Sequence, residues 1–129
     1  MKPATTTPNN LYPPSILKSI CIARNLINED VGTHMVLRKL AKNAGTNEFT
    51  LKKGFKDIFK ITIYQYLLKS RMQYASRLLQ TTDLKVKDIG KVCGFETLSG
   101  FITSFKKYHG ITPGEIKRIS IAKNKLYKI

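Results

Sequence analysis

The most numerous chemically active side chains in this sequence are cations. The 129 residues include 23 Lys and Arg against 8 Asp and Glu, a formal net charge of +15. Three lysines, Lys52, Lys53 and Lys56, recur with Phe49 at the spacing of one helix face. A charge excess of this size attracts polyanions, either nucleic acid or an anionic membrane surface. The chemistry that these residues offer is therefore electrostatic binding of an extended anion.

Groups that could catalyse a reaction or hold a metal are scarce. Cys21 and Cys93 lie far apart, without a histidine or second cysteine at ligand spacing. His34 and His109 are likewise isolated, and no Ser/His/Asp grouping, glycine-rich phosphate loop or carboxylate pair can be assembled. We therefore predict reduced, packed cysteines, surface or hydrogen-bonded histidines, no metal or cofactor, and no enzyme activity.

The N-terminal segment and the apolar stretches indicate a cytoplasmic protein. No run of about 18 apolar residues is present that could cross a membrane. Residues 1–12 contain one lysine and no apolar core, so they do not resemble a secretory signal. They are rich in Pro, Thr and Asn, which predicts a disordered lead-in or linker.

The spacing of apolar residues predicts an all-α fold with about seven helices. We expect a first helix-turn-helix subdomain over 13–61, a linker helix over 62–80, a second helix-turn-helix subdomain over 81–122 and a basic tail over 123–129. Within the linker helix, Lys69, Arg71 and Arg77 are expected to face mostly outward.

The first helix-turn-helix is predicted from a short helix over 35–43, a turn containing Gly45, and a helix over 48–59 that Asn47 caps. The second of these helices has an apolar face and a basic face. The apolar face comprises Leu51, Phe55, Ile58 and Phe59, and the opposite face comprises Phe49, Lys52, Lys53 and Lys56.

The same pattern recurs about 50 positions later, which indicates an internal repeat. Leu40-Ala41 and Gly45 are matched by Ile89-Gly90 and Gly94, and Phe55-Lys56 and Ile61-Thr62 by Phe105-Lys106 and Ile111-Thr112. We expect helices over 86–93 and 97–109, with Thr97 as N-cap, a buried stripe of Phe101, Phe105 and Tyr108, and a last helix that begins at Pro113.

These residues resemble the DNA-binding domain of the AraC/XylS family of bacterial transcription regulators. The most specific stretch, IGKVCGFETLSGFITSFKKYHGITPGEIK, matches the family signature of Gly-Phe, Phe-x-x-x-Phe-Lys and Gly-x-Thr-Pro. The first copy, LAKNAGTNEFTLKKGFKDIF, and the linker pattern Arg71-Met72-x-x-Ala75-x-x-Leu78-Leu79 match as well. The likeness runs from about Ile16 to Ile119, and NEFTLKKGFK resembles the siderophore-responsive, pyochelin-receptor type of regulator.

The resemblance implies that the two recognition helices enter successive major-groove segments, about one DNA turn or 34 Å apart. The base-contact candidates that it implies are Phe49, Lys52, Lys53, Leu98, Ser99 and Thr103. The phosphate-contact candidates are Thr46, Asn47, Lys56, Thr97, Lys106 and Lys107.

Alternatives stay open at several of these positions. The lysines could instead contact phosphates or water only, Phe49 could make a hydrophobic contact at its helix start, and Leu98 could belong to the core. The family often has Arg where Thr103 stands and longer polar residues near Leu98 and Ser99. We therefore expect the first unit to supply most of the direct base readout.

The implied function is that of a sequence-specific transcriptional regulator, and activation is the expected direction of control. Its partners would be double-stranded DNA and, as a candidate, RNA polymerase, with no membrane partner and a monomeric DNA-binding unit. Family members of the siderophore-responsive type carry a sensing domain, so this chain would be a C-terminal fragment or a stand-alone relative. Alternatives are an RNA-binding or ribosome-associated basic helical protein, for which exposed aromatics would be expected, and a basic protein of membrane surfaces.

Overall fold

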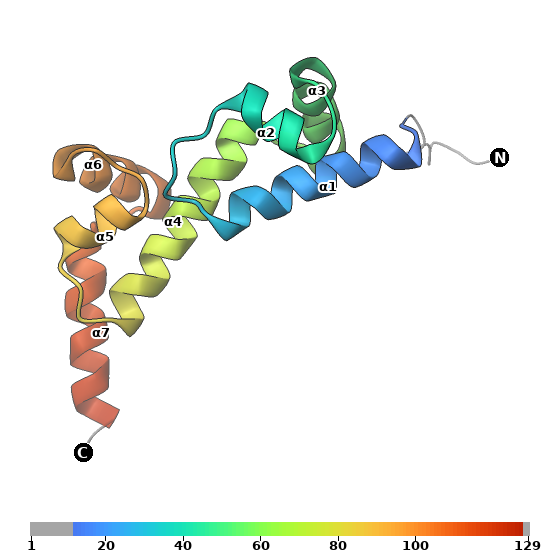
Figure 1. The fold of residues 1–129 in the computed structure, drawn as a ribbon. Coiled ribbons are helices and arrows are strands. Elements are labelled where there is room, and N and C mark those ends of the chain that lie inside the picture. The colour runs from blue at the N-terminus through green and yellow to red at the C-terminus, as the bar shows by residue number, and fades with distance from the viewer. Residues whose placement is uncertain (1–11, 128–129) are drawn as a thin grey trace. The chain divides into compact units, whose positions relative to one another are not determined.

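The computed structural model describes residues 12–127, and seven helices without any strand make up this part of the chain. The predicted all-α fold is confirmed (Figure 1). Apart from Tyr12, the expected lead-in lies outside the described residues. The helices are α1 (Pro14–Glu29), α2 (Leu37–Ala44), α3 (Glu48–Phe59), α4 (Ile63–Thr81), α5 (Val86–Val92), α6 (Leu98–His109) and α7 (Pro113–Tyr127).

The chain divides into two compact units, and α4 contributes residues to both. Of the described residues, the first unit holds 12–30 and 34–68, and the second holds 31–33 and 69–127. Each unit has its own hydrophobic core.

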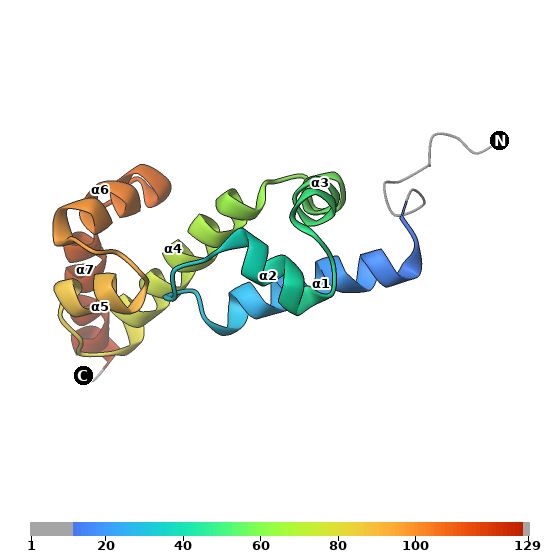
Figure 2. The same ribbon diagram turned by 45° about the horizontal axis from the view of Figure 1, so that its top comes forward.

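The core of the first unit forms where α1, α2 and α3 pack together, and both views show α2 and α3 lying beside α1 (Figures 1 and 2). Ile20, Ala23 and Ile27 recur along one face of α1 and are buried, as this spacing predicts. Leu51 and Phe55 complete the core from α3, each fully buried. The burial of this inner face leaves the opposite face of α3 exposed.

The core of the second unit repeats this arrangement. Met72, Ala75 and Leu79 of α4 have the same spacing as the buried residues of α1 and are likewise buried. They pack with Phe101 and Phe105 of α6, whose rings meet edge to face with centroids 5.7 Å apart. One helix face of α6 is thereby anchored in the core.

One side chain of this second unit was assigned wrongly from the sequence, whereas His109 is hydrogen-bonded as expected. Tyr108 was placed on the buried stripe, but it is 42% exposed. His109 is the half-buried residue at the end of α6. Its ring lies 4.4 Å from that of Phe105, and its Nε2 is 3.1 Å from the carbonyl oxygen of Met72.

Arg71 was also assigned wrongly, because its side chain is half-buried and its guanidinium is hydrogen-bonded to backbone carbonyls. Nε donates to the carbonyl oxygen of Val31 at 2.7 Å, and Nη2 donates to that of Thr33 at 3.3 Å. The group also lies close to Gly94 in the turn after α5. Partial burial lowers the pKa of Arg71 from its ordinary value. Arg71 therefore holds the 31–33 loop within the second unit.

The predicted start of α2 differs from the observed one. Val36 is the N-cap of α2, with extended backbone and 51% exposure, so the helix begins at Leu37 and not at residue 35. The last helix, for which only the start was predicted, continues to Tyr127 and so includes part of the segment expected as a basic tail.

Candidate nucleic-acid interface

The two recognition-helix candidates, α3 and α6, are built alike. Each has 12 residues and a capping side chain: Asn47 Oδ1 accepts from the Thr50 backbone N–H at 2.9 Å, and Thr97 Oγ1 accepts from that of Gly100 at 3.0 Å. Both predicted N-caps are confirmed.

Both helices also end alike, with a residue in the left-handed conformation. These residues are Lys60, with φ 67°, and Gly110, with φ 78°. A threonine directly precedes each of the following helices, α4 and α7, and an acceptor side chain stands three residues after it. In the first unit these are Thr62 and Gln65, and in the second Thr112 and Glu115, each pair bonding reciprocally to the other's backbone N–H.

The outer face of α3 carries the predicted side chains, and all of them are exposed. Phe49 is 76% exposed and belongs to neither core cluster, so it makes no core contact at the helix start. Lys52, Lys53 and Lys56 follow on this face and are likewise exposed. The arrangement presents an aromatic ring and three cations together.

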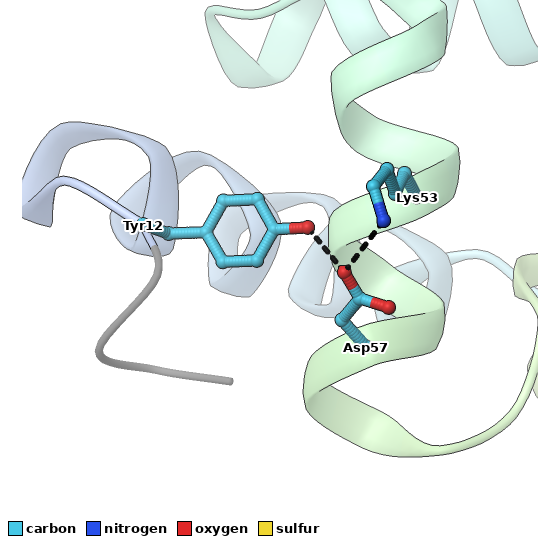
Figure 3. A network of polar contacts seen from close by, with 3 residues as sticks. All are labelled: Tyr12, Lys53 and Asp57. Atoms are coloured by element: carbon cyan, nitrogen blue, oxygen red, sulfur yellow. Dashed lines mark hydrogen bonds and ion pairs between the residues drawn. The ribbon is translucent and has the colours of Figure 1, made fainter. Parts of the chain in front are cut away.

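Lys53, one of the base-contact candidates, has an ion-pair partner that was not predicted. Its Nζ lies 3.3 Å from Asp57 Oδ2, one turn farther along α3. The hydroxyl of Tyr12, which lies just before α1, donates to the same carboxylate oxygen at 2.5 Å (Figure 3). The hydrogen bond from Tyr12, followed by that from Lys53, holds the pKa of Asp57 below its usual range and, in return, raises the pKa of Tyr12.

A second acidic residue lies at the beginning of α3. Glu48 Oε2 is 3.8 Å from Nε of Arg38 in α2, and both side chains are at least half exposed. An ion pair with this exposure contributes little to stability. It does place Arg38 beside the start of the candidate recognition helix.

The outer face of α6 has a different character. Ser99 and Thr103 are exposed, and Leu98 is 44% exposed and absent from the core cluster, so it does not extend the buried stripe. Ile102, which occupies the position of Lys52 in the repeat, is half-buried. The first turns of α6 thus offer small hydroxyls and a leucine.

The phosphate-contact candidates differ in what they can donate. The caps use the acceptor oxygens of Asn47 and Thr97, which leaves the Asn47 Nδ2 protons and the Thr97 hydroxyl proton as donors. Thr46 is half-buried, and its backbone N–H is bonded to the carbonyl oxygen of Ala41. The lysine candidates Lys56, Lys106 and Lys107 are all exposed.

Tyr12, Asp57 and Arg38, together with Glu48 of α3, are polar residues of this surface that were not predicted from the sequence. The i, i+4 spacing of Lys53 and Asp57 is a local signal from which the pair could have been found. Tyr12 has no such signal, because it is 45 positions from Asp57. Tyr12, Arg38 and α3 are separated in the sequence, and only the fold brings them together.

Within residues 12–127, no three acidic, cysteine or histidine side chains lie together as ligands for a metal ion. No helix in that range combines the length and apolar character that crossing a membrane requires.

Comparisons with known proteins identify the family. A family model described as "Helix-turn-helix domain" matches residues 40–119. The Transcriptional activator AggR of Escherichia coli is 34% identical over 90 residues, which cover 70% of this chain and 34% of AggR. The Xylose operon regulatory protein of Haemophilus influenzae is 33% identical over 56% of this chain and 19% of its own length. The chain thus spans about a third or less of these two relatives.

Solved structures of bacterial regulators have the same fold as this chain. The C-terminal domain of the two-component response regulator yesN from Fusobacterium nucleatum is 38% identical, with a TM-score of 0.67 over 74% of this chain and 93% of that one. A DNA-binding transcriptional dual regulator from Escherichia coli K-12 is 26% identical, with a TM-score of 0.74 over 87% of this chain and 96% of that one. From its sequence match and its fold, the chain belongs to the AraC-type family of helix-turn-helix DNA-binding transcriptional regulators.

Proposed function

We propose that this chain binds a specific duplex DNA site and regulates transcription from it, with α3 and α6 each entering a major groove. The observation that carries the proposal is the repeated construction of these helices. Each is capped at its start, anchored by buried side chains on one face and exposed on the other. A rigid helix with a free polar face suits the width of the major groove.

Within this proposal, α3 supplies most of the direct readout. Lys52 and Lys53 can donate to guanine O6 and N7, and Phe49 can pack on a thymine methyl. In α6, Leu98 can contact a thymine methyl, and the hydroxyls of Ser99 and Thr103 can bond to base edges. The phosphate anchors are Thr46, Asn47, Lys56, Thr97, Lys106 and Lys107, which position the chain without reading sequence.

As for partners, the proposal includes RNA polymerase, because AggR carries the name of a transcriptional activator. The domain binds DNA as a monomer, since its two units replace the two halves of a symmetric dimer. Both AggR and the xylose regulator are far longer than this chain, which agrees with a sensing or dimerising domain elsewhere in the regulator. The proposed place of action is chromosomal DNA in the bacterial cytoplasm.

Selection of bound duplexes from a random DNA pool tests the proposal directly. We expect a site of about two DNA turns with one half more strictly specified than the other. Affinity for this site should fall with salt, with a log–log slope near −5 if about six phosphates are neutralised. Retention of no common motif, a slope near zero, or tighter binding to structured RNA than to the selected duplex would contradict the proposal.

Two lysine variants separate the proposed roles. Lys53→Ala is expected to cost about 1–3 kcal/mol of binding free energy and to relax preference at one base position. Lys106→Ala should weaken binding to all sequences alike and make the salt slope about one unit shallower. If both variants lose affinity equally on every sequence, the assignment of Lys53 to base readout is wrong.

A further inference from the structure

Two of the side chains in Figure 3, Tyr12 and Lys53, donate to the same carboxylate oxygen of the third, Asp57. Asp57 Oδ2 accepts both the ammonium of Lys53 at 3.3 Å and the hydroxyl of Tyr12 at 2.5 Å. The Lys53 side chain is 60% exposed and that of Asp57 is 29% exposed. The network therefore lies at the edge of the outer face of α3, within reach of a molecule that covers this face.

The ion pair of Lys53 with this carboxylate competes with a hydrogen bond from Lys53 to a DNA base. An ammonium has three protons, but to reach a base edge in the proposed complex the Lys53 side chain must extend away from α3, and Asp57 then loses its ion-pair partner. The carboxylate would remain near the DNA surface, where its charge repels phosphate. The Tyr12 hydroxyl is a neutral donor that this oxygen keeps when Lys53 leaves.

We infer that Tyr12 and Asp57 are positioning residues that determine how readily Lys53 reaches a base, and hence the strength of base preference at that position of the DNA site. The inference rests on the proposed function. Asp57 retains Lys53 against α3. Tyr12 donates a hydrogen bond to the carboxylate of Asp57, which weakens the hold of this carboxylate on Lys53.

The ring of Tyr12 supports a specific role for its hydroxyl. Cε1 lies 3.5 Å from the point that a Cβ on Gly54 would occupy, so the ring rests close to the backbone of α3. Tyr12→Phe keeps this ring contact and removes only the hydrogen bond. Tyr64, 53% exposed on α4, provides the matched control Tyr64→Phe.

The expected effects follow from the strength of an exposed i, i+4 ion pair, which corresponds to about a twofold change in an equilibrium constant. Tyr12→Phe should raise the Kd for the selected duplex about twofold and weaken preference at the base that Lys53→Ala also relaxes. Asp57→Asn should lower the Kd about two- to threefold and strengthen that preference. The control Asp83→Asn makes the same charge change outside both recognition helices.

The decisive experiment is a double-mutant cycle on the full chain, with Kd and base preference measured for each variant. The inference predicts that Tyr12→Phe changes neither quantity once Lys53 is alanine. In the DNA-free protein, the pKa of Asp57, followed by NMR, should rise in Tyr12→Phe and stay constant in Tyr64→Phe.

Three outcomes would overturn the inference. An effect of Tyr12→Phe that persists in the Lys53→Ala background would show that Tyr12 acts on the fold alone. Unchanged base preference in both Tyr12→Phe and Asp57→Asn, with the parent chain binding its duplex normally, would contradict this inference and leave the proposed function intact. Failure of the parent chain to bind any duplex would overturn both.

Discussion

Replacing Lys60 with glycine is expected to stabilise the first unit, although it removes a side chain. Lys60 ends α3 with φ 67°, the one non-glycine residue with positive φ in the described chain. Its backbone N–H bonds to the carbonyl oxygen of Lys56 at 2.9 Å, so the helix end holds it in this conformation. The equivalent position of the repeat is Gly110, which adopts φ 78° and bonds to Lys106 in the same way.

The magnitude comes from two opposing terms. A left-handed conformation costs a residue with a Cβ about 1–2 kcal/mol. Glycine loses more backbone entropy on folding, which offsets about 0.5–1 kcal/mol of that gain. Lys60→Gly should therefore add about 0.5–1 kcal/mol to the free energy of unfolding, which corresponds to a rise of about 2–8 °C in Tm for a unit of this size.

Thermal unfolding followed by circular dichroism measures this shift, and two further variants isolate its cause. Lys60→Ala removes the same charge but keeps the Cβ, so it should not share the gain. Gly110→Ala should cost about 1 kcal/mol, because a Cβ there meets no atom within 4 Å and the cost is conformational only. Equal Tm values for Lys60→Gly and Lys60→Ala would refute the reasoning.

Two further predictions concern the second unit. Arg71→Met should lower the free energy of unfolding of this unit by about 2 kcal/mol, because the buried carbonyl of Val31 loses its donor. The control Lys69→Met on the same helix should change it by less than about 0.5 kcal/mol. Amide hydrogen exchange in this unit measures both effects, and equal protection of the amides in the two variants would contradict the role of Arg71. Hydrogen bonds from Thr112 hold the pKa of Glu115 below its ordinary value of 4.5. The ionised group therefore stabilises α7 above about pH 4.5, and this stabilisation is lost as the pH falls through the lowered pKa. Glu115→Gln should unfold with a shallower pH dependence between about pH 5 and 3, and an unchanged profile would argue against the capping box.

Local signals account for what could be predicted from the sequence. Helix α3 was predicted with its observed bounds, because Asn47 caps its start and its apolar residues recur with the helix period. The repeat then predicted α6 from the same pattern, with Thr97 in the capping position. Exposure of Phe49 and the three lysines followed from the burial of the opposite face.

Contacts between distant segments account for what could not. A sequence pattern places Arg71 on a helix face, but it does not show that the 31–33 loop returns to cover that face. At the end of α6, Tyr108 and His109 have similar amphipathic character, and the carbonyl of Met72 favours burial of the histidine. Tyr12 was assigned to a lead-in by composition, which carries no information about Asp57.

The outer faces of α3 and α6 differ in how their charged side chains are distributed, and this difference bears on the separate roles proposed for the two helices. Helix α3 has three lysines, but Glu48 and Asp57 offset part of their charge, and both acids have cationic partners. Helix α6 has two lysines in its last turn and no acid, and Lys107 stands where the repeat has Asp57. Lys52 and Lys53 lie in the middle of α3, where we expect them to reach base edges, and Asp57 pairs with Lys53 when no base competes for its ammonium. The lysines of α6 lie at its end, where they can attract phosphate from any sequence. The same frame thus supports a selective helix and an anchoring helix, which is why we expect one half of the DNA site to be strictly specified and the other to tolerate substitution.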